Sequence, residues 1–346
     1  MNATRPAVRG KIRHRALAAT LAALALAMAA TSLVGPLGLG LMRYRTSPNT
    51  LHQLLGSDLA ALVAVAPLTV AAAVLALRRH PVAPPLAVGL AVYALYTYAQ
   101  VIIGQEYLRE PGNVERFFPL LLVVFLLAEA VLVLGWRALP PTLPSPSPRL
   151  GRVAGLTLLV VAAFLVFGLH LRSMVMAWSD PSSLTEYASS PTPFWMVKLM
   201  DLGVVAPAAV VVGVGMLRRA GWARRAAYAL LTGWTCLAAS VTAMAVVMAV
   251  DGDPDASVAL ACGSGVAAIA LGGLTVAFYR SLMTRCRTAP ATPMCWCAPD
   301  VPRDVALGWM PTPRAVPAST ARPAGTMKPV QASPGGPVDS RRRSNL

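Results

Sequence analysis

Glu129 is the residue whose type and position most directly suggest chemistry. It lies within residues 120–134, a stretch that is otherwise apolar. A carboxylate at the centre of a bilayer costs about 2.5–3.5 kcal/mol on insertion scales, so we expect Glu129 to face the interior of a helical bundle and to have a partner there. A desolvated carboxylate of this kind suits a proton or cation site. The alternative is a structural residue that is protonated or bonded to a tyrosine.

The expected partners of Glu129 lie on the third apolar segment. Tyr93, Tyr96 and Gln100 follow the i, i+3, i+7 spacing that places side chains on one face of a helix. Such a stripe of polar side chains predicts either the lining of a polar cavity or a seam of interhelical hydrogen bonds. The sequence does not distinguish these two interpretations.

Four more ionisable residues lie near the ends of apolar segments. Asp58 and Asp201 begin the second helix of each half of the chain, and Lys198 precedes Asp201 at a spacing that predicts an ion pair on one helix face. The pair is interpreted either as boundary charges or as a substrate site at the outer mouth of a cavity. His170, near the outer end of the fifth segment, is of a type that titrates near neutral pH, although a lone histidine is more often a structural hydrogen-bond donor.

Two loops and a set of absent motifs complete the chemical inventory. Residues 105–116 are dense in polar side chains and predict a small network or a binding lip, whereas residues 251–255 alternate carboxylates but lack the later Gly and Glu of a calcium loop. The tail cysteines have no histidine nearby, so we predict no metal site and no cofactor. No phosphate-binding loop, dinucleotide fingerprint, HExxH or GxSxG is present. Enzymatic activity would then require a membrane-embedded site, for which Glu129 and His170 would have to meet.

The elements that carry these residues follow from composition. The chain has 346 residues, of which 56% are hydrophobic and 13% charged, against about 25% charged in soluble domains. A hydrocarbon core of about 30 Å needs about 20 apolar residues in a helix, and backbone groups in lipid must be satisfied within the segment. We therefore predict an all-α, polytopic transmembrane helical bundle with about eight spans, roughly 16–41, 59–77, 86–103, 118–136, 153–178, 195–217, 226–250 and 257–279.

The charge pattern predicts the membrane and the sidedness. The formal net charge is +16, but basic residues flank the apolar segments without interleaved aromatics, so the partner is a lipid bilayer and not nucleic acid. Basic residues gather on the side of the N-terminus and acids on the other, which predicts a multi-pass protein of the plasma membrane with both termini in the cytoplasm. The excess of Arg over Lys suggests a bacterial source. The triplet 27–29 leaves a cleaved signal peptide, and hence seven spans, as the alternative.

An internal duplication is predicted from three matches in the same order. Residues 65–79 and 205–219 share eight of fifteen positions, including Pro67 with Pro207 and a terminal Arg-Arg pair. Residues 93–97 resemble 228–232, and residues 47–51 resemble 180–184. Because each half has an even number of spans, the repeat is parallel. The predicted domains are a first four-helix repeat (1–140), a Pro-rich linker (141–152), a second four-helix repeat (153–280) and a disordered basic tail (281–346).

These features favour a transporter of a small solute or ion, with a polar cavity between the two repeats. The alternative is a non-catalytic membrane sensor, scaffold or assembly partner, which the missing motifs, short loops and long tail suggest. The basic end of the tail is expected to contact anionic lipid, at about 1 kcal/mol per residue near the surface.

Overall fold

The apolar segments of the sequence form long helices in the computed structural model. It describes residues 4–140, 143–144 and 146–288. The predicted disordered tail lies, from residue 289 onward, outside these described residues, but the helix that precedes it continues to Thr288.

Eight helices of the described chain are long and apolar enough to cross a membrane, which confirms the prediction of a multi-pass, all-helical protein. Three of them contain a π-helical turn and are therefore divided into shorter elements. In order the elements are α1 (Thr4–Val34), α2 (Pro48–Ala60), η1 (Ala61–Val65), α3 (Ala66–Leu77), α4 (Ala83–Ile103), η2 (Val114–Phe117), α5 (Phe118–Ala138), α6 (Pro148–Ala163), η3 (Phe164–His170), α7 (Leu171–Ser179), η4 (Pro181–Ser183), α8 (Thr185–Ser189), α9 (Pro191–Met200), η5 (Asp201–Val205), α10 (Ala206–Leu217), α11 (Gly221–Val250) and α12 (Val258–Thr288).

Several helix boundaries differ from the prediction, and two of these differences have identifiable reasons. The first helix ends at Val34 and not near residue 41, because the chain turns at Gly35 and Pro36 although it stays apolar. The second helix begins at Pro48, well before residue 59, with Ser47 as its N-cap. Its first turns carry polar side chains, so hydropathy alone does not detect them.

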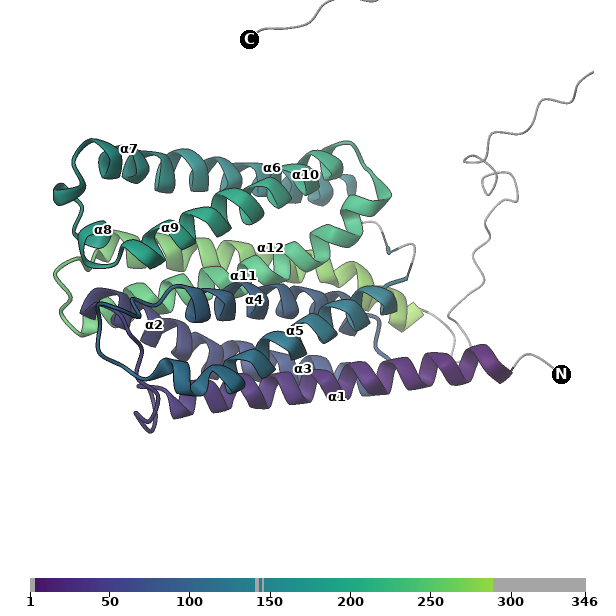
Figure 1. Ribbon diagram of the computed structural model, residues 1–346. Coiled ribbons are helices and arrows are strands. Elements are labelled where there is room, and N and C mark those ends of the chain that lie inside the picture. Colours follow the sequence, from purple (N-terminus) through teal and green to yellow (C-terminus); the bar gives the residue numbers. More distant parts are fainter. Residues whose placement is uncertain (1–3, 141–142, 145, 289–346) are drawn as a thin grey trace, which may run out of the picture. The chain divides into compact units, whose positions relative to one another are not determined.

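The helices pack around a central pair, α4 and α11 (Figure 1). On one side α1 packs against α3 and α5, and on the other α6 packs against α10. The last helix, α12, packs chiefly on α11. Glycines allow the closest approaches. A Cβ atom on Gly89 would clash with Thr232 of α11, and Gly155 of α6 faces the backbone of Gly213 in α10.

Two equivalent features recur in the helices of the predicted duplication. The π-helical turns η1 and η5 occupy the same register before Pro67 and Pro207. Proline lacks an N–H and crowds the preceding turn, and a π turn re-satisfies the freed backbone. Both helices then end in a left-handed arginine, Arg79 with φ 54° and Arg219 with φ 58°.

The other two matches do not share local structure in the same way. Residues 47–51 start the long helix α2, whereas residues 181–183 form a short 3₁₀ turn before α8. The counterpart of Ser47-Pro48 in the fold is Ser190-Pro191, which opens α9. Tyr93 bonds to α11, whereas Tyr228 bonds to Ser281 of α12.

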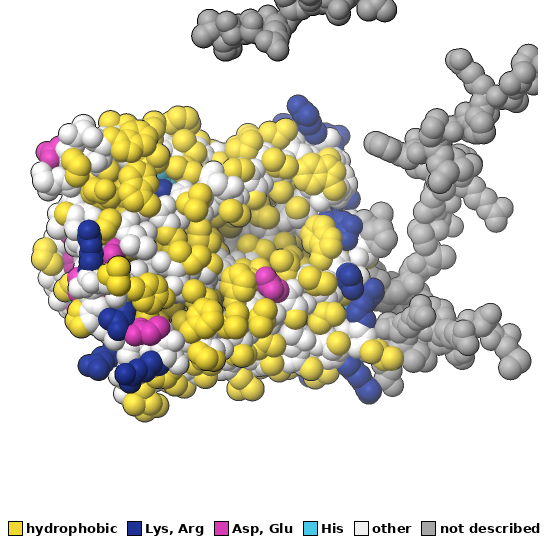
Figure 2. Space-filling model, viewed as in Figure 1, with side chains coloured by type: hydrophobic (Ala, Val, Ile, Leu, Met, Phe, Trp, Pro, Cys, Tyr) yellow, Lys and Arg dark blue, Asp and Glu magenta, His cyan; other side chains and the backbone are white. Residues whose placement is uncertain are grey.

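The two ends of the bundle differ in charge. Arg and Lys side chains gather at the end where α1 begins, and Asp and Glu side chains at the opposite end, among basic ones (Figure 2). Between these ends the surface shown is mostly hydrophobic. This is the surface expected of a protein that contacts a lipid bilayer.

The crossing of α2 and α11 gives a stability prediction. A Cβ atom on Gly56 would overlap the backbone of Ala243 and Met244, which cannot move aside as a flexible side chain could. We expect Gly56→Ala to lower the free energy of unfolding by about 1–3 kcal/mol through overpacking. The measurement is the thermal unfolding midpoint of the detergent-purified protein.

The matched control for this change is Gly263→Ala on α12. No atom lies within 4 Å of the Cβ position at Gly263, and alanine improves helix propensity by about 1 kcal/mol. The control is expected to unfold at the same temperature or slightly higher. A Gly56→Ala protein as stable as this control would contradict the close crossing.

Candidate functional site

The strongest candidate site is a buried cluster centred on Asp201. The Tyr96 hydroxyl donates to one carboxylate oxygen at 2.5 Å, and His170 Nε2 lies 2.8 Å from the other. Asp201 is 7% exposed and His170 is 2% exposed. Both partners of the carboxylate therefore hold it inside the bundle, where an unpaired charge would be strongly disfavoured.

Two nitrogen atoms near this cluster have no hydrogen-bond partner among the described residues. They are Nδ1 of His170 and Nε2 of Gln100, and both are buried. Buried polar groups are usually satisfied by protein or ordered water. One of these nitrogens belongs to a residue bonded to Asp201, and the other to a residue that interacts with Tyr96. They indicate a place where water, a proton or a polar ligand binds.

Non-standard helical turns position the residues of the cluster. His170 is the last residue of the π-helix η3, and Asp201 is the first residue of the π-helix η5. Tyr96 reaches Asp201 from α4, which belongs to the other half of the chain. π turns interrupt the regular ladder of helix hydrogen bonds and occur frequently at functional sites.

Lys198 does not form the ion pair predicted with Asp201. Its ammonium nitrogen lies 3.1 Å from the centroid of the Phe194 ring, in a cation–π contact. The ion pairs of the described residues do not include Lys198, although its charge interacts with that of Asp201 over a longer distance. The reason is geometric: Asp201 turns toward α4 and η3, where Tyr96 and His170 already satisfy it.

A second buried carboxylate, Asp58, lies in the first half. The Tyr44 hydroxyl donates to it at 2.8 Å, and the Ser32 hydroxyl lies at 3.4 Å. Burial, followed by the charge and the hydrogen bond of Asp58, raises the pKa of Tyr44 well above its usual value. Tyr44 therefore stays protonated and able to donate. The bonds of this cluster connect the loop before α2, which carries Tyr44, to Asp58 of α2 and Ser32 of α1.

The tyrosines of α4 interact with different neighbouring elements. Tyr93 bonds to Ser240 of α11 at 2.8 Å, whereas Tyr96 bonds to Asp201. Tyr98 is 2% exposed and interacts electrostatically with Asp58. Within the predicted stripe, Tyr93 and Tyr96 thus form interhelical hydrogen bonds, whereas Nε2 of Gln100 has no partner among the described residues. The contacts of the tyrosines also place α4 between the two buried acids.

Glu129 is exposed on the outer surface of α5, so the expectation that it faces the bundle interior is wrong. It does not meet His170, which is buried on η3 and bonds to Asp201. An apolar segment shows that a carboxylate is in the membrane, but it does not show which face of the helix carries it. No residue of the predicted α4 stripe bonds to Glu129.

At the acidic end, residues 105–116 bond to the loop before α2, and the ion pairs of the described residues include none between the acids and arginines of residues 105–116 themselves. The guanidinium of Arg45 lies 2.6 Å from the carboxylate of Glu115. The backbone N–H of Arg45 donates to the side-chain oxygen of Gln105 at 2.8 Å. Asp253 is bonded to His52 of α2 at 2.6 Å. Burial raises the pKa of Asp253, but hydrogen bonds from His52, the Asp255 amide and Asn49 outweigh it and leave the pKa lowered. Asp253 and Asp255, in the loop after α11, thus bond to His52 and Asn49 of α2. The described residues contain no cluster of metal ligands.

Sequence reasoning named Asp201, His170 and Tyr96 separately but did not bring them together. It missed Tyr44 and Ser32 entirely, since a loop tyrosine and a serine in an apolar helix give no periodic signal. The chain matches no protein-family model, no curated protein and no solved structure. The site must therefore be interpreted from its own geometry.

The bond between Tyr44 and Asp58 gives a second prediction. Tyr44→Phe removes the closer donor of a buried carboxylate, which costs about 1–3 kcal/mol. The raised pKa means that this contribution is present below the ordinary tyrosine pKa of about 10 and is lost only as the pH rises through the higher folded value. Thermal unfolding at neutral pH is the measurement.

Tyr107→Phe is the matched control, because it removes the hydroxyl of a tyrosine that is 41% exposed. We expect this control to change the midpoint little, since water replaces the bond from Tyr107 to the carbonyl of Ile102. Equal midpoints for the two variants would show that the Asp58 cluster does not stabilise the fold.

Proposed function

We propose that this integral membrane protein is a transporter that moves protons or a small cation, alone or with a solute. The buried cluster of Asp201, His170 and Tyr96 is its ion site. The observation that carries the proposal is a membrane-embedded carboxylate whose histidine partner keeps a second nitrogen unsatisfied. Ionisable residues within membrane spans mark ion and proton pathways more often than they serve packing.

The chemistry follows from the hydrogen-bond roles of the three groups. An ionised Asp201 accepts from the Tyr96 hydroxyl and from Nε2–H of a neutral His170, which leaves Nδ1 as an acceptor. A proton that binds at Nδ1 converts the pair into an imidazolium and a carboxylate, so the cluster changes from one net negative charge to zero. A charge change in a poorly solvated place alters the relative free energies of conformations.

The position of the cluster supports coupling between the two halves. Tyr96 lies on α4 of the first half, whereas Asp201 and His170 lie on η5 and η3 of the second. Movement of one half against the other would break or form the bond from Tyr96. The shared π turns and left-handed arginines support an internal duplication, and parallel repeats of this kind occur in transporters that bind substrate between their halves.

Proton flux into liposomes tests the proposal. We expect the purified protein to acidify or alkalinise vesicles loaded with a pH-sensitive dye when a membrane potential is imposed. Asp201→Asn should lower the rate about tenfold or more, because it removes the ionisable group. Asparagine keeps the shape and still accepts from Tyr96, so the fold is retained.

Glu129→Gln is the matched control, as an exchange of acid for amide within another span. Glu129 lies on the outer face of α5, away from the cluster, and we expect its variant to keep the wild-type rate. Flux that survives Asp201→Asn, or wild-type protein without flux under any imposed gradient, would contradict the proposal. A pH-dependent conformational change without flux would instead favour a sensor.

We further propose that the protein lies in the plasma membrane with both termini in the cytoplasm. Arginines of the α3–α4 and α10–α11 turns lie on the side of the N-terminus, and the acids of the loops after α4 and α11 lie on the other. Fusions of green fluorescent protein after residues 80 and 220 should fluoresce, and fusions after residues 110 and 253 should not. Alkaline phosphatase fused at the same residues should give the reverse, and a uniform result would contradict this topology.

A further inference from the structure

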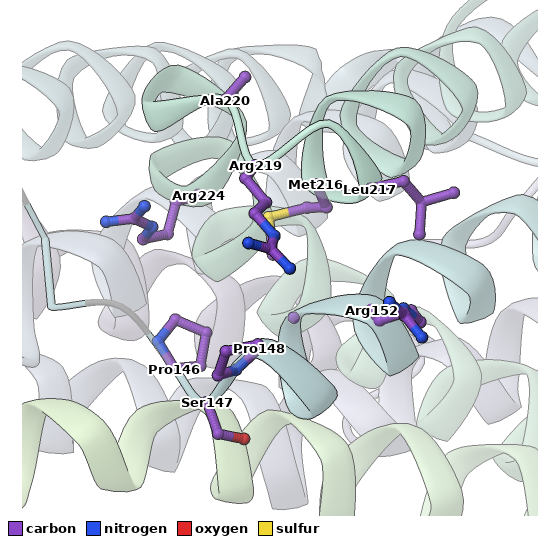
Figure 3. A pocket seen from close by; sticks show the side chains of 10 residues that line it. Pro146, Ser147, Pro148, Arg152, Met216, Leu217, Arg219, Ala220 and Arg224 are labelled. Atoms are coloured by element: carbon purple, nitrogen blue, oxygen red, sulfur yellow. The ribbon is translucent and has the colours of Figure 1, made fainter.

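A pocket at the basic end of the bundle is separate from the Asp201 cluster. It has a volume of about 260 Å³ and lies where the start of α6, the end of α10 and the start of α11 meet (Figure 3). Pockets for drug-sized ligands are larger, about 300–1,000 Å³. This pocket is therefore of a size for a compact group.

Three arginines give the pocket its character. Arg219 extends from the α10–α11 turn into the space between Arg224 and Arg152 (Figure 3). The residues that line the pocket include no Asp or Glu, and the ion pairs of the described chain involve none of these arginines. Three positively charged residues that line one recess, with no acid among them, favour an anion there.

Of the three arginines, Arg224 is held by a side-chain bond, whereas the side chains of Arg152 and Arg219 are exposed. The Arg224 guanidinium donates to the carbonyl of Leu143 at 3.2 Å, which fixes it against the linker. Arg219 is in the left-handed conformation, with φ 58°, a strained state for a residue other than glycine. The hydroxyl of Ser147 caps α6 at the floor of the pocket, and that helix start adds partial positive charge.

Apolar side chains complete the wall. Met216 and Leu217 line the pocket beside the arginines, and Leu217 is 39% exposed. An exposed leucine at the end of a membrane helix contacts the acyl region of the bilayer. The recess thus combines arginine donors suited to phosphate oxygens with an apolar border.

From these features we infer that the pocket formed by Arg152, Arg219 and Arg224 binds a phosphoryl group. The source is either the headgroup of an anionic phospholipid or a soluble phosphate. Guanidinium groups bind phosphate oxygens through paired hydrogen bonds. The apolar border by Leu217 suits the glycerol and upper acyl chain of a lipid.

Ligand-dependent thermal stability of the delipidated full chain tests this site and separates the two sources. One series adds short-chain phosphatidylglycerol, a second adds inorganic phosphate, and short-chain phosphatidylcholine and chloride are the references. Stabilisation by phosphatidylglycerol alone assigns a lipid headgroup, and stabilisation by phosphate as well assigns a site open to soluble anions. We expect the double change Arg152→Gln and Arg219→Gln to lower the affinity for whichever anion stabilises the wild type by about tenfold or more, because charge-assisted hydrogen bonds are lost.

Two matched variants keep the inference falsifiable. Arg79→Gln changes the left-handed arginine of the other half, which has the same backbone strain but does not line the pocket. Arg137→Gln removes a basic charge from the same end of the bundle, outside the pocket. Both should bind as the wild type does. Equal weakening by all these variants, no weakening by the double change, or stabilisation that does not distinguish the anions from the references would overturn the site.

Discussion

The structure depends on the limited number of hydrogen-bond partners that a membrane offers to a polar side chain. In hydrocarbon no water satisfies a carboxylate or hydroxyl, so the buried polar groups of these helices are stabilised where they meet one another, whereas Glu129 lies on the outer face of α5. Asp58 meets Tyr44 and Ser32, and Asp201 meets Tyr96 and His170. Each carboxylate joins elements that are distant in sequence. Apolar contacts between helices discriminate weakly when lipid is equally apolar, so these bonds and the glycine crossings fix which helices are neighbours.

Helix α4 is one of the two helices, with α2, that join the first part of the chain to α11. It packs closely on α11 where Gly89 meets Thr232, and its tyrosines extend in different directions. Tyr98 lies toward Asp58, whereas Tyr96 bonds to Asp201. A change in protonation at Asp201 would therefore act on the same helix that contacts the cluster of the first half. The bonds of α4 thus connect the ion chemistry of the proposed site with the packing of the halves.

The sequence predicted the eight spans because length and hydropathy are properties of a whole segment, and a few misplaced residues do not alter them. The sequence did not predict which face of a helix a side chain lies on, or which partner it bonds to. Glu129 was identified correctly as a carboxylate in an apolar helix, but the outer face of α5 carries it, since both faces of that helix are apolar. Lys198 and Asp201 have the spacing of an ion pair, yet Tyr96 and His170 occupy the carboxylate. The start of α2 was missed because its polar first turns are stabilised by tertiary bonds such as that between His52 and Asp253.

The two ends of the bundle satisfy their charges in opposite ways. At the acidic end Glu106 accepts from the amide of Thr192, Glu115 pairs with Arg45 and Asp253 pairs with His52. These bonds connect the loops of that end to one another and to the helices beside them. At the basic end Arg152 and Arg219 have no carboxylate partner among the described residues, which leaves their guanidinium groups able to pair with an anion from outside this part of the chain. In the proposed site this anion is a phosphoryl group, for which a membrane surface with anionic lipids is one source. The two ends therefore differ in how their charges are paired, and the proposed phosphate site lies at the end where arginines line a pocket without acids.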